Sequence, residues 1–291
     1  MKLVLENGDV YTGLKGFGVK PDSKSVLYGE LCFTTSMTGY TETLSDPSYH
    51  GQFIVSTHPT AGSYGFNRHN LDSNSFKASA FIVHSYYERG IDNNHEAHAN
   101  LHERMEKDGV VGLQDVPTRR IVKKIRREGV MRAAIAPQEV PVSDIEFNDS
   151  PSSKQLISAV STSKITQDPT PGPVCVVYDF GVKYNMMNML RRHGVSVLRV
   201  PYNTNPVTLF NKRPDIKGVL ISNGPGDPRD LTSSIERIKW IMNNADVPVF
   251  GICLGHQIMA LASGLDVEKM HHGHRGINQP VFEKASSNSL I

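Results

Sequence analysis

The chain has 291 residues and an ordinary globular composition, with 38% apolar and 21% charged residues. Its net charge of +2 at pH 7 indicates no particular polyanionic partner, so we expect no nucleic-acid partner. Three scattered cysteines exclude a disulfide framework, and no C-x-x-C pair indicates zinc. The N-terminus predicts no signal peptide and no apolar run approaches about 18 residues, so we expect a cytoplasmic protein that does not bind a membrane.

Strand-like segments with turn residues between them dominate the first half of the chain. Asn7-Gly8 lies between two such segments and predicts a β-hairpin with a type I′ turn. Two helices are predicted in this half, over residues 95–107 and 119–128. In the second helix Ile121 and Ile125 belong to an apolar stripe, and the other face is basic.

The basic run RRIVKKIRREGVMR, residues 119–132, has alternative functional interpretations. A run of lysine and arginine can bind nucleic acid, but this one contains no aromatic residue and the rest of the chain is nearly neutral. A solvated helix face, or a docking surface for an acidic protein partner, is therefore favoured.

The composition changes near the middle of the chain. Serine, aspartate, threonine and proline are frequent from residue 143 to 173, which is typical of a junction. A chain of this length also exceeds the size at which single cores usually stop growing. We therefore predict an N-terminal domain over residues 1–150, a linker over 151–172 and a C-terminal domain over 173–291.

Apolar strands alternate with helices after the junction. The predicted strands cover residues 173–180, 195–200, 218–222 and 247–252, and the predicted helices cover 183–193, 206–211 and 233–244. This alternation is typical of βαβ units and predicts a parallel sheet with helices on both faces. The fold class is α/β, with a β-rich N-terminal domain and a parallel-sheet C-terminal domain. Sites in such sheets form at the carboxyl ends of strands.

Residues 247–264, VPVFGICLGHQIMALASG, predict a strand, a sharp turn at Cys253 and a helix. Gly251 and Gly255 would keep bulk away from the turn, as in the G-x-S-x-G elbow of hydrolases, so a larger residue at either position should clash. The helix start should favour the thiolate, which makes Cys253 a candidate nucleophile. The alternative is that Cys253 is a small apolar core residue.

The segment SNGPGDP, residues 222–228, follows the third predicted strand of the second half. Gly224 and Gly226 allow backbone N–H groups to approach a ligand. Together with the N–H of Leu254, the residue after the candidate nucleophile, this segment could form an oxyanion hole. The alternative is an ordinary Gly-Pro-Gly turn.

GICLGHQ together with SNGPGDP resembles the class I glutamine amidotransferases. SMTGYTETLSDPSYHGQ and VVYDFGVKYNMMNML resemble the small, glutamine-hydrolysing subunits of carbamoyl-phosphate synthetase, and this resemblance covers residues 1–282. It implies hydrolysis of L-glutamine to glutamate and ammonia. A large partner subunit would use the ammonia with bicarbonate, ATP and Mg to make carbamoyl phosphate for arginine and pyrimidine synthesis. This chain itself would need no cofactor.

The resemblance also implies roles for particular residues. Cys253 would be the nucleophile, and the residues with backbone donors to the oxyanion would be Gly224 and Leu254. The residues that hold the glutamine would be Ser48, Gly226 and Gln257. Because Ser48 belongs to the N-terminal domain, the resemblance places the pocket at the interface between the domains.

The sequence departs from this family after residue 281. The family pattern continues with an asparagine and a glycine that bind glutamine and with a His-x-Glu pair that supplies the base. These residues do not follow here, so we expect glutaminase activity of this polypeptide to be far below that of a completed version. His256, His271, His272 and His274 are expected to be structural or surface residues. No metal site is expected, because no carboxylate or cysteine completes a ligand set.

Two other functions are compatible with the sequence. One is a non-catalytic module that docks on the large subunit without hydrolysing glutamine. The other is an unrelated cysteine hydrolase acting on esters or peptides, which leaves SNGPGDP and the N-terminal half unexplained.

Overall fold

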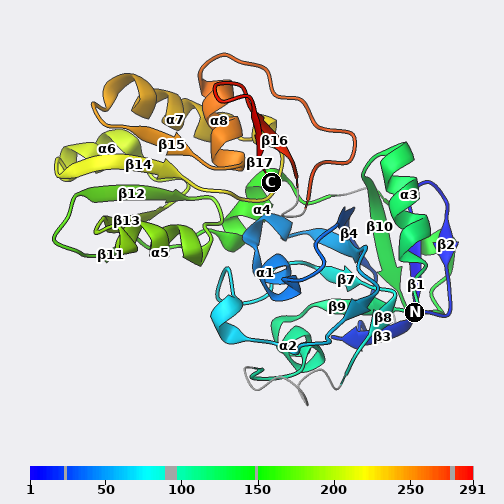
Figure 1. The fold of residues 1–291 in the computed structure, drawn as a ribbon. Helices are drawn as coiled ribbons and strands as arrows, with labels where there is room; N and C mark the ends of the chain where they lie inside the picture. Colours follow the sequence, from blue (N-terminus) through cyan, green and yellow to red (C-terminus); the bar gives the residue numbers. More distant parts are fainter. Residues whose placement is uncertain (23–24, 89–96, 148–149, 276–278, 291) are drawn as a thin grey trace.

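The computed structural model describes residues 1–291 except 23–24, 89–96, 148–149, 276–278 and 291. The two halves of the chain form separate β-sheets that lie side by side (Figure 1). Helices pack on both sheets, which confirms the predicted α/β class.

The first sheet contains eight strands in the described residues. Its middle strands β4, β5, β7 and β9 run parallel to one another, and the flanking strands pair antiparallel. In spatial order the strands are β2 (Val10–Tyr11), β1 (Lys2–Leu5), β10 (Met131–Ala136), β4 (Leu27–Thr34), β5 (Gln52–Ser56), β7 (Ala80–Ile82), β9 (Val111–Gln114) and β3 (Lys15–Gly18). The short strands β6 (Thr60–Ala61) and β8 (Ser85–Tyr86) pair separately.

Helices cover both faces of the first sheet. Successive side chains of a strand point to opposite faces, so Phe53 of β5 packs in the cluster under α3 (Thr118–Glu128). Its neighbour Ile54 packs in the cluster under α1 (Tyr40–Ser45) and α2 (Leu101–Asp108). Burial of both faces explains why the central strands are almost continuously apolar.

Two predictions for this half differ from the structure. The helix expected over residues 95–107 begins at Leu101, where the Asn100 side chain caps it, and residues 95–96 lie outside the described part. The strands β1 and β2 do form a hairpin, but only Gly8, with φ of 92°, has a left-handed conformation in its turn. A type I′ turn needs positive φ at two residues, so that prediction was wrong.

The second sheet has the order β11-β13-β12-β14-β15. The four strands β13 (Ser196–Pro201), β12 (Val174–Asp179), β14 (Ile216–Ile221) and β15 (Val249–Gly251) are parallel, as predicted. The outer strand β11 (Thr166–Asp168) pairs antiparallel with β13.

The helices of the second half also lie on opposite faces of their sheet. Side chains of α6 (Pro206–Lys212), α7 (Thr232–Asn244) and α8 (Leu254–Ala262) pack in one cluster with Val176 of β12. Side chains of α5 (Tyr184–Arg192) pack with Val177 on the other face. Figure 1 shows the same arrangement, with α5 on the opposite side of the sheet from α6 and α7.

The region predicted as a linker is structured. It contains α4 (Ser153–Val160), which begins with a capping box between Ser152 and Gln155, and the strand β11. Short 3₁₀ turns occur at η1 (Pro47–Tyr49), η2 (Arg68–Asn70), η3 (Val142–Asp144) and η4 (Pro228–Asp230).

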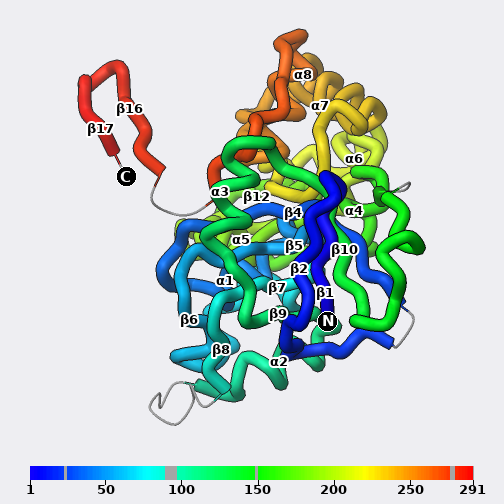
Figure 2. Tube along the Cα trace, turned by 90° about the vertical axis from the view of Figure 1, so that its right-hand side faces the viewer, coloured from blue at the N-terminus to red at the C-terminus, as the bar shows by residue number. Residues whose placement is uncertain are grey.

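The last described residues form a hairpin that stands apart from both sheets (Figure 2). Its strands β16 (Val281–Glu283) and β17 (Asn288–Leu290) are exposed throughout. Phe250 of the edge strand β15 is also 66% exposed. Across the described residues, no helix combines the length and hydropathy required to span a membrane.

Asp179 organises the end of β12 and the approach to α5. Its carboxylate is fully buried and accepts hydrogen bonds from the backbone N–H groups of Gly181, Val182 and Thr162. It also pairs with the guanidinium of Arg199 at 2.6 Å. Four residues therefore donate to one buried carboxylate.

We predict that Asp179→Ala lowers the free energy of unfolding of the second half by about 3–5 kcal/mol, because it removes one partner of a buried ion pair and leaves buried donors unpaired. Trp240, the only tryptophan, lies on α7, so urea unfolding followed by its fluorescence measures this change. The control Asp179→Asn keeps one acceptor oxygen and should lose less stability. Equal losses in the two variants would contradict this role.

Candidate active site

Cys253 occupies a strained turn between β15 and α8. Its backbone has φ of 52° and ψ of −112°, a conformation that non-glycine residues rarely adopt. The residue directly precedes the first helical residue, Leu254. Its side chain is exposed, so Cys253 is not an apolar residue of the core.

Two glycines permit this turn. A Cβ on Gly255 would lie 2.2 Å from the carbonyl oxygen of Ile221, and a Cβ on Gly251 would lie 2.7 Å from the backbone of Gly255. Both contacts involve main-chain atoms, which cannot rotate away as a side chain can. The expectation that a larger residue would clash at either position is confirmed.

The loop after β14 lies against the turn. Gly255 donates its N–H to the carbonyl oxygen of Ser222 at 3.1 Å, and a Cβ on Gly224 would meet the Leu254 side chain at 3.0 Å. The N–H of Leu254 donates to the Cys253 sulfur, whereas the N–H of Gly224 has no acceptor within the described residues. The two residues that carry these N–H groups lie next to each other, and an oxyanion hole requires neighbouring donors.

Ser48, in η1 of the first half, contacts the loop that holds Gly224. Its hydroxyl oxygen accepts a hydrogen bond from the Asn223 side chain at 2.9 Å. Its backbone N–H donates to the carboxylate of Asp46 at 2.8 Å, and Asn223 donates to the same carboxylate at 3.3 Å. Ser48 therefore lies at the contact between the two sheets, beside the residue that precedes Gly224.

An ion-pair cluster holds the two halves together next to Ser48. Lys183, just before α5, pairs with Asp46 at 2.7 Å and with Asp72 at 3.0 Å. Burial alone would lower the pKa of Lys183, but the two carboxylates outweigh it and raise that pKa. Burial raises the pKa of Asp72, although Lys183 opposes this shift. The charge of Lys183 is thus stabilised by carboxylates from the other half of the chain.

The linker helix α4 supports the position of Gly226. Gly226 has φ of 97°, and a Cβ there would lie 2.7 Å from the Cβ of Ser153. The buried hydroxyl of Ser153 accepts a hydrogen bond from the N–H of Asp227 at 2.8 Å and donates to Asp230 at 2.7 Å. The loop after β14 is therefore fixed on one side by α4 and on the other by the Cys253 turn.

A cavity of about 1460 Å³ extends between the two sheets. Leu254 is buried and does not line this cavity. The other residues with implied roles all line this cavity: Ser48, Gly224, Gly226, Cys253 and Gln257. The structure thus brings together groups from both halves of the chain, at the carboxyl ends of parallel strands.

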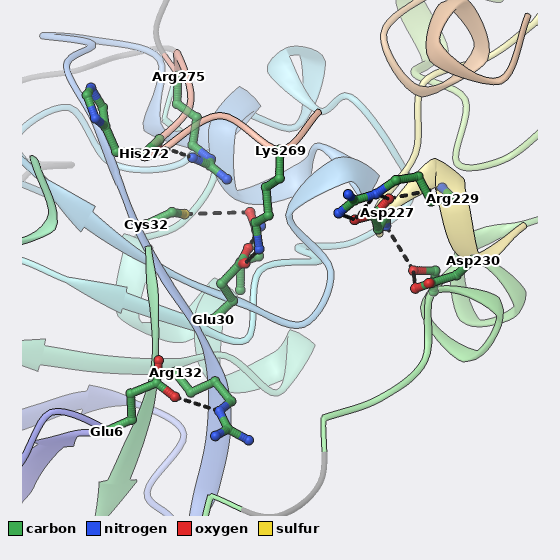
Figure 3. A network of polar contacts seen from close by, with 12 residues as sticks. Glu6, Glu30, Cys32, Arg132, Asp227, Arg229, Asp230, Lys269, His272 and Arg275 are labelled. Atoms are coloured by element: carbon green, nitrogen blue, oxygen red, sulfur yellow. Dashed lines mark hydrogen bonds and ion pairs between the residues drawn. The ribbon is translucent and has the colours of Figure 1, made fainter. Parts of the chain in front are cut away.

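The segment after α8, residues 266–275, forms one wall of the cavity. It is attached to the first half at three places: Lys269 to Glu30, His271 to Val130, and Arg275 to Thr35. Figure 3 shows the ion pair between Lys269 and Glu30, whose nitrogen and oxygen are 2.6 Å apart. Gln52 donates to Glu30 and accepts from the buried thiol of Cys32, which extends this network into the first sheet.

The pKa of the Cys253 thiol is raised above its ordinary value. Although the side chain is accessible from the cavity, the surrounding protein removes water from the sulfur. This desolvation is the largest cause of the raised pKa, and Asp46 acts in the same direction. The N–H of Leu254 and the charges of Lys183 and Arg275 lower the pKa but do not outweigh burial. The N–H at the helix start thus favours the thiolate, as expected, but burial of the sulfur outweighs this effect on the pKa.

None of the charged groups that shift the pKa of Cys253 is a histidine. His271 is exposed and its Nε2 lies 3.1 Å from the carbonyl oxygen of Arg127. The ring of His272 stacks on Phe33, and its buried Nδ1 has no hydrogen-bond partner among the described residues. In the part of the chain that the structure describes, no group of histidine, cysteine or carboxylate side chains is arranged to hold a metal ion.

Sequence reasoning missed the groups that hold the pocket together. Asp46, Lys183 and Asn223 lie within sequence motifs that were noted for other reasons, but their pairing joins residues far apart in the chain. The wall formed by residues 266–275 was likewise not expected. The sequence does show charged or polar residues beside buried strands. It does not show which of these residues pair with one another.

Two families match this chain. The family "Carbamoyl-phosphate synthase small chain, CPSase domain" matches residues 3–135, and "Glutamine amidotransferase class-I" matches residues 176–290. The carbamoyl phosphate synthase pyrimidine-specific small chain of Halalkalibacterium halodurans is 39% identical over 98% of this chain and 76% of its own length. The carbamoyl phosphate synthase small chain of Bacillus cereus is 38% identical over 100% of this chain and 77% of its own. The pyrimidine-specific small chain of Bacillus subtilis is 38% identical over 98% and 76%.

We predict that Gly255→Ala displaces the Cys253 turn and lowers the free energy of unfolding by about 1–3 kcal/mol, because the added Cβ overlaps main-chain atoms. Urea unfolding followed by Trp240 fluorescence measures the change. The control is Gly218→Ala in β14, where the nearest atoms to a Cβ are 3.9 Å away. Similar stability of the two variants would show that the turn tolerates a side chain.

We also predict that alkylation of Cys253 by iodoacetamide has its midpoint at a pH above that of an ordinary thiol. A raised pKa means that the reactive thiolate forms only as the pH rises past that higher value. A Cys253→Ala variant identifies background labelling, which should be slow because Cys32 is buried and Cys175 has its pKa raised to about 11. A midpoint below the ordinary thiol range would reveal a base acting on Cys253.

Proposed function

Since the chain belongs to the carbamoyl phosphate synthase small chain family, we propose that it binds L-glutamine in the cavity between its two sheets and hydrolyses the side-chain amide. The observation that carries this proposal is the exposed Cys253 on a strained turn, facing a cavity shared with Ser48. An accessible thiol that lines a cavity together with polar groups suits acyl transfer from a small amide.

In the proposed reaction, the Cys253 sulfur attacks the amide carbon of glutamine. The carbonyl oxygen gains negative charge, which the N–H groups of Leu254 and Gly224 would stabilise. The C–N bond then breaks, and the nitrogen takes up a proton and departs as ammonia. The acyl group remains on Cys253 as a thioester. Water hydrolyses the thioester to glutamate and regenerates the thiol. The proton that the Cys253 thiol gives up balances the proton that the leaving nitrogen takes up.

The bound glutamine would contact both halves of the chain. In the proposal, Ser48, Gly226 and Gln257 hold the substrate, since all three line the cavity that contains Cys253. Asn223 is an additional positioning residue, because it bonds to Ser48 and directly precedes Gly224. Its buried side-chain oxygen has no partner within the described residues and could accept a hydrogen bond in the pocket.

The ammonia is proposed to pass to a large, ATP-dependent subunit that makes carbamoyl phosphate. ATP and Mg would be used by that partner, and this chain would need no cofactor. A cytoplasmic location also belongs to the proposal, and it is supported by three free thiols. Two of the relatives described above are pyrimidine-specific chains, which supports pyrimidine rather than arginine synthesis.

A second candidate function is docking on the large subunit without hydrolysis of glutamine. The raised pKa of Cys253 favours it, because a protonated thiol without a base is a weak nucleophile. This candidate predicts complex formation without glutamate production. Measuring glutamate in the reconstituted complex decides between the two.

We predict that L-glutamine slows the labelling of Cys253 by a chloroketone analogue of glutamine, because the two compete for one pocket. Ser48→Ala should raise the glutamine concentration needed for protection roughly 2- to 10-fold, the effect of losing one hydrogen bond worth about 0.5–1.5 kcal/mol. Mass spectrometry of the Cys253 peptide gives the labelling rate.

The control for this experiment is Ser158→Ala, an exposed serine on α4 that does not line the cavity. It should behave as the unmodified chain does. Labelling that L-glutamine leaves unchanged, with D-glutamine as the comparison, would refute the amidotransferase pocket. Protection without any glutamate formation in the complex would support the docking function.

A further inference from the structure

The exposed face of α3 concentrates positive charge, most of which makes no ion pair within the described residues. Four of its side chains are exposed and make no ion pair or hydrogen bond within the described residues: Arg119, Arg120, Lys123 and Arg126. The remaining two cations of the helix are paired, Lys124 with Asp9 and Arg127 with Glu128. We call the four unpaired side chains the α3 basic face.

This arrangement works against the stability of the helix. Arg119 and Lys123 are four residues apart and Lys123 and Arg126 are three apart, so like charges are neighbours on the helix surface and repel one another. The helix also has no acidic residue in its first turn. A helix face that served only to keep the protein soluble would be more stable with positively and negatively charged residues in alternation. A partner that supplied negative charge would remove this repulsion.

The remaining surface of α3 limits the kinds of partner. Its apolar residues Ile121 and Ile125 are fully buried in the core of the first sheet, so no apolar face is left to enter a membrane. The helix has no aromatic side chain on which a nucleic-acid base could stack, and the net charge of the whole chain is only +2. An acidic protein surface is the partner chemistry that fits.

The basic face is connected to the wall of the cavity. The helix ends at Glu128, and the next residues are fixed to the segment that lines the cavity beside Cys253. The Val130 N–H donates to the His271 carbonyl oxygen at 3.0 Å, and the His271 ring nitrogen Nε2 lies 3.1 Å from the carbonyl oxygen of Arg127. A protein bound to α3 would thus contact the element that positions residues 269–275.

We propose that the α3 basic face is the docking surface for an acidic surface of the large, ATP-dependent subunit. This inference rests on the proposed function, because it takes its partner from there. In Figure 1, α3 lies on the opposite side of the molecule from α5, α6 and α7, so docking there leaves the helices of the second sheet uncovered.

The test measures the affinity of this chain for the large subunit of the same organism by titration calorimetry at several salt concentrations. The variant Arg119→Glu/Lys123→Glu/Arg126→Glu should bind roughly 10- to 100-fold more weakly at low salt, because attraction becomes repulsion. The neutral variant Arg119→Gln/Lys123→Gln/Arg126→Gln should show a smaller loss and a weaker salt dependence than the unmodified chain.

The matched control reverses three exposed cations of the second half, Arg192→Glu/Lys212→Glu/Lys239→Glu, and changes the net charge equally. Its affinity should stay within about twofold of the unmodified chain, since these residues lie on α5, α6 and α7. Trp240 fluorescence and circular dichroism confirm that each variant is folded.

Equal binding by the α3 variant and the unmodified chain would overturn the docking surface and leave the partner proposal intact. No binding of the unmodified chain to the large subunit would overturn both. A DNA duplex that binds the unmodified chain at physiological salt, and not the α3 variant, would replace the protein partner by a nucleic acid. Selective loss of large-subunit binding in the α3 variants supports the inference.

Discussion

The approach of α8 to the end of β14 is so close that no side chain fits between them. A Cβ on Gly255 would lie 2.2 Å from the Ile221 carbonyl oxygen, so the helix can begin this close to β14 only with hydrogen at that position. The chain can then reach the helix from β15 only through a sharp turn, and Cys253 takes the strained conformation. The same contact holds the loop after β14 against the turn, through the bond from Gly255 to Ser222. The exposed sulfur and its neighbouring N–H donors thus result from one packing constraint.

The second sheet supplies the thiol, but the first sheet completes the pocket. Lys183 and the two carboxylates Asp46 and Asp72 connect the halves, and the amide of Asn223 carries this connection to Ser48. Removing one charge of this half-buried cluster would leave the opposite charges without a partner, which costs free energy. The positions of these residues at the interface therefore resist change. Desolvation by these neighbours and the nearby carboxylate of Asp46 both raise the pKa of the Cys253 thiol.

Local patterns predicted the second sheet and its turn well. Alternating apolar strands and helices fixed the parallel arrangement, and the glycine spacing around Cys253 identified the steric constraint at Gly251 and Gly255. Properties that depend on distant residues were not predictable in this way. The protonation of Cys253 depends on burial and on Asp46, and a turn type depends on φ at single residues such as Asn7. Neither quantity is determined by the residues within a short window of sequence.

The wall segment has a mechanical consequence. The main chain passes from the first sheet to the second once, through α4 and β11, and residues 266–275 then lie back across the first sheet as a noncovalent strap. Two separate attachments remove the freedom to swivel that a single tether would leave. With the Lys183 ion pairs as a further attachment, rotation of one half against the other is restricted, which helps to keep the width of the cavity between them constant.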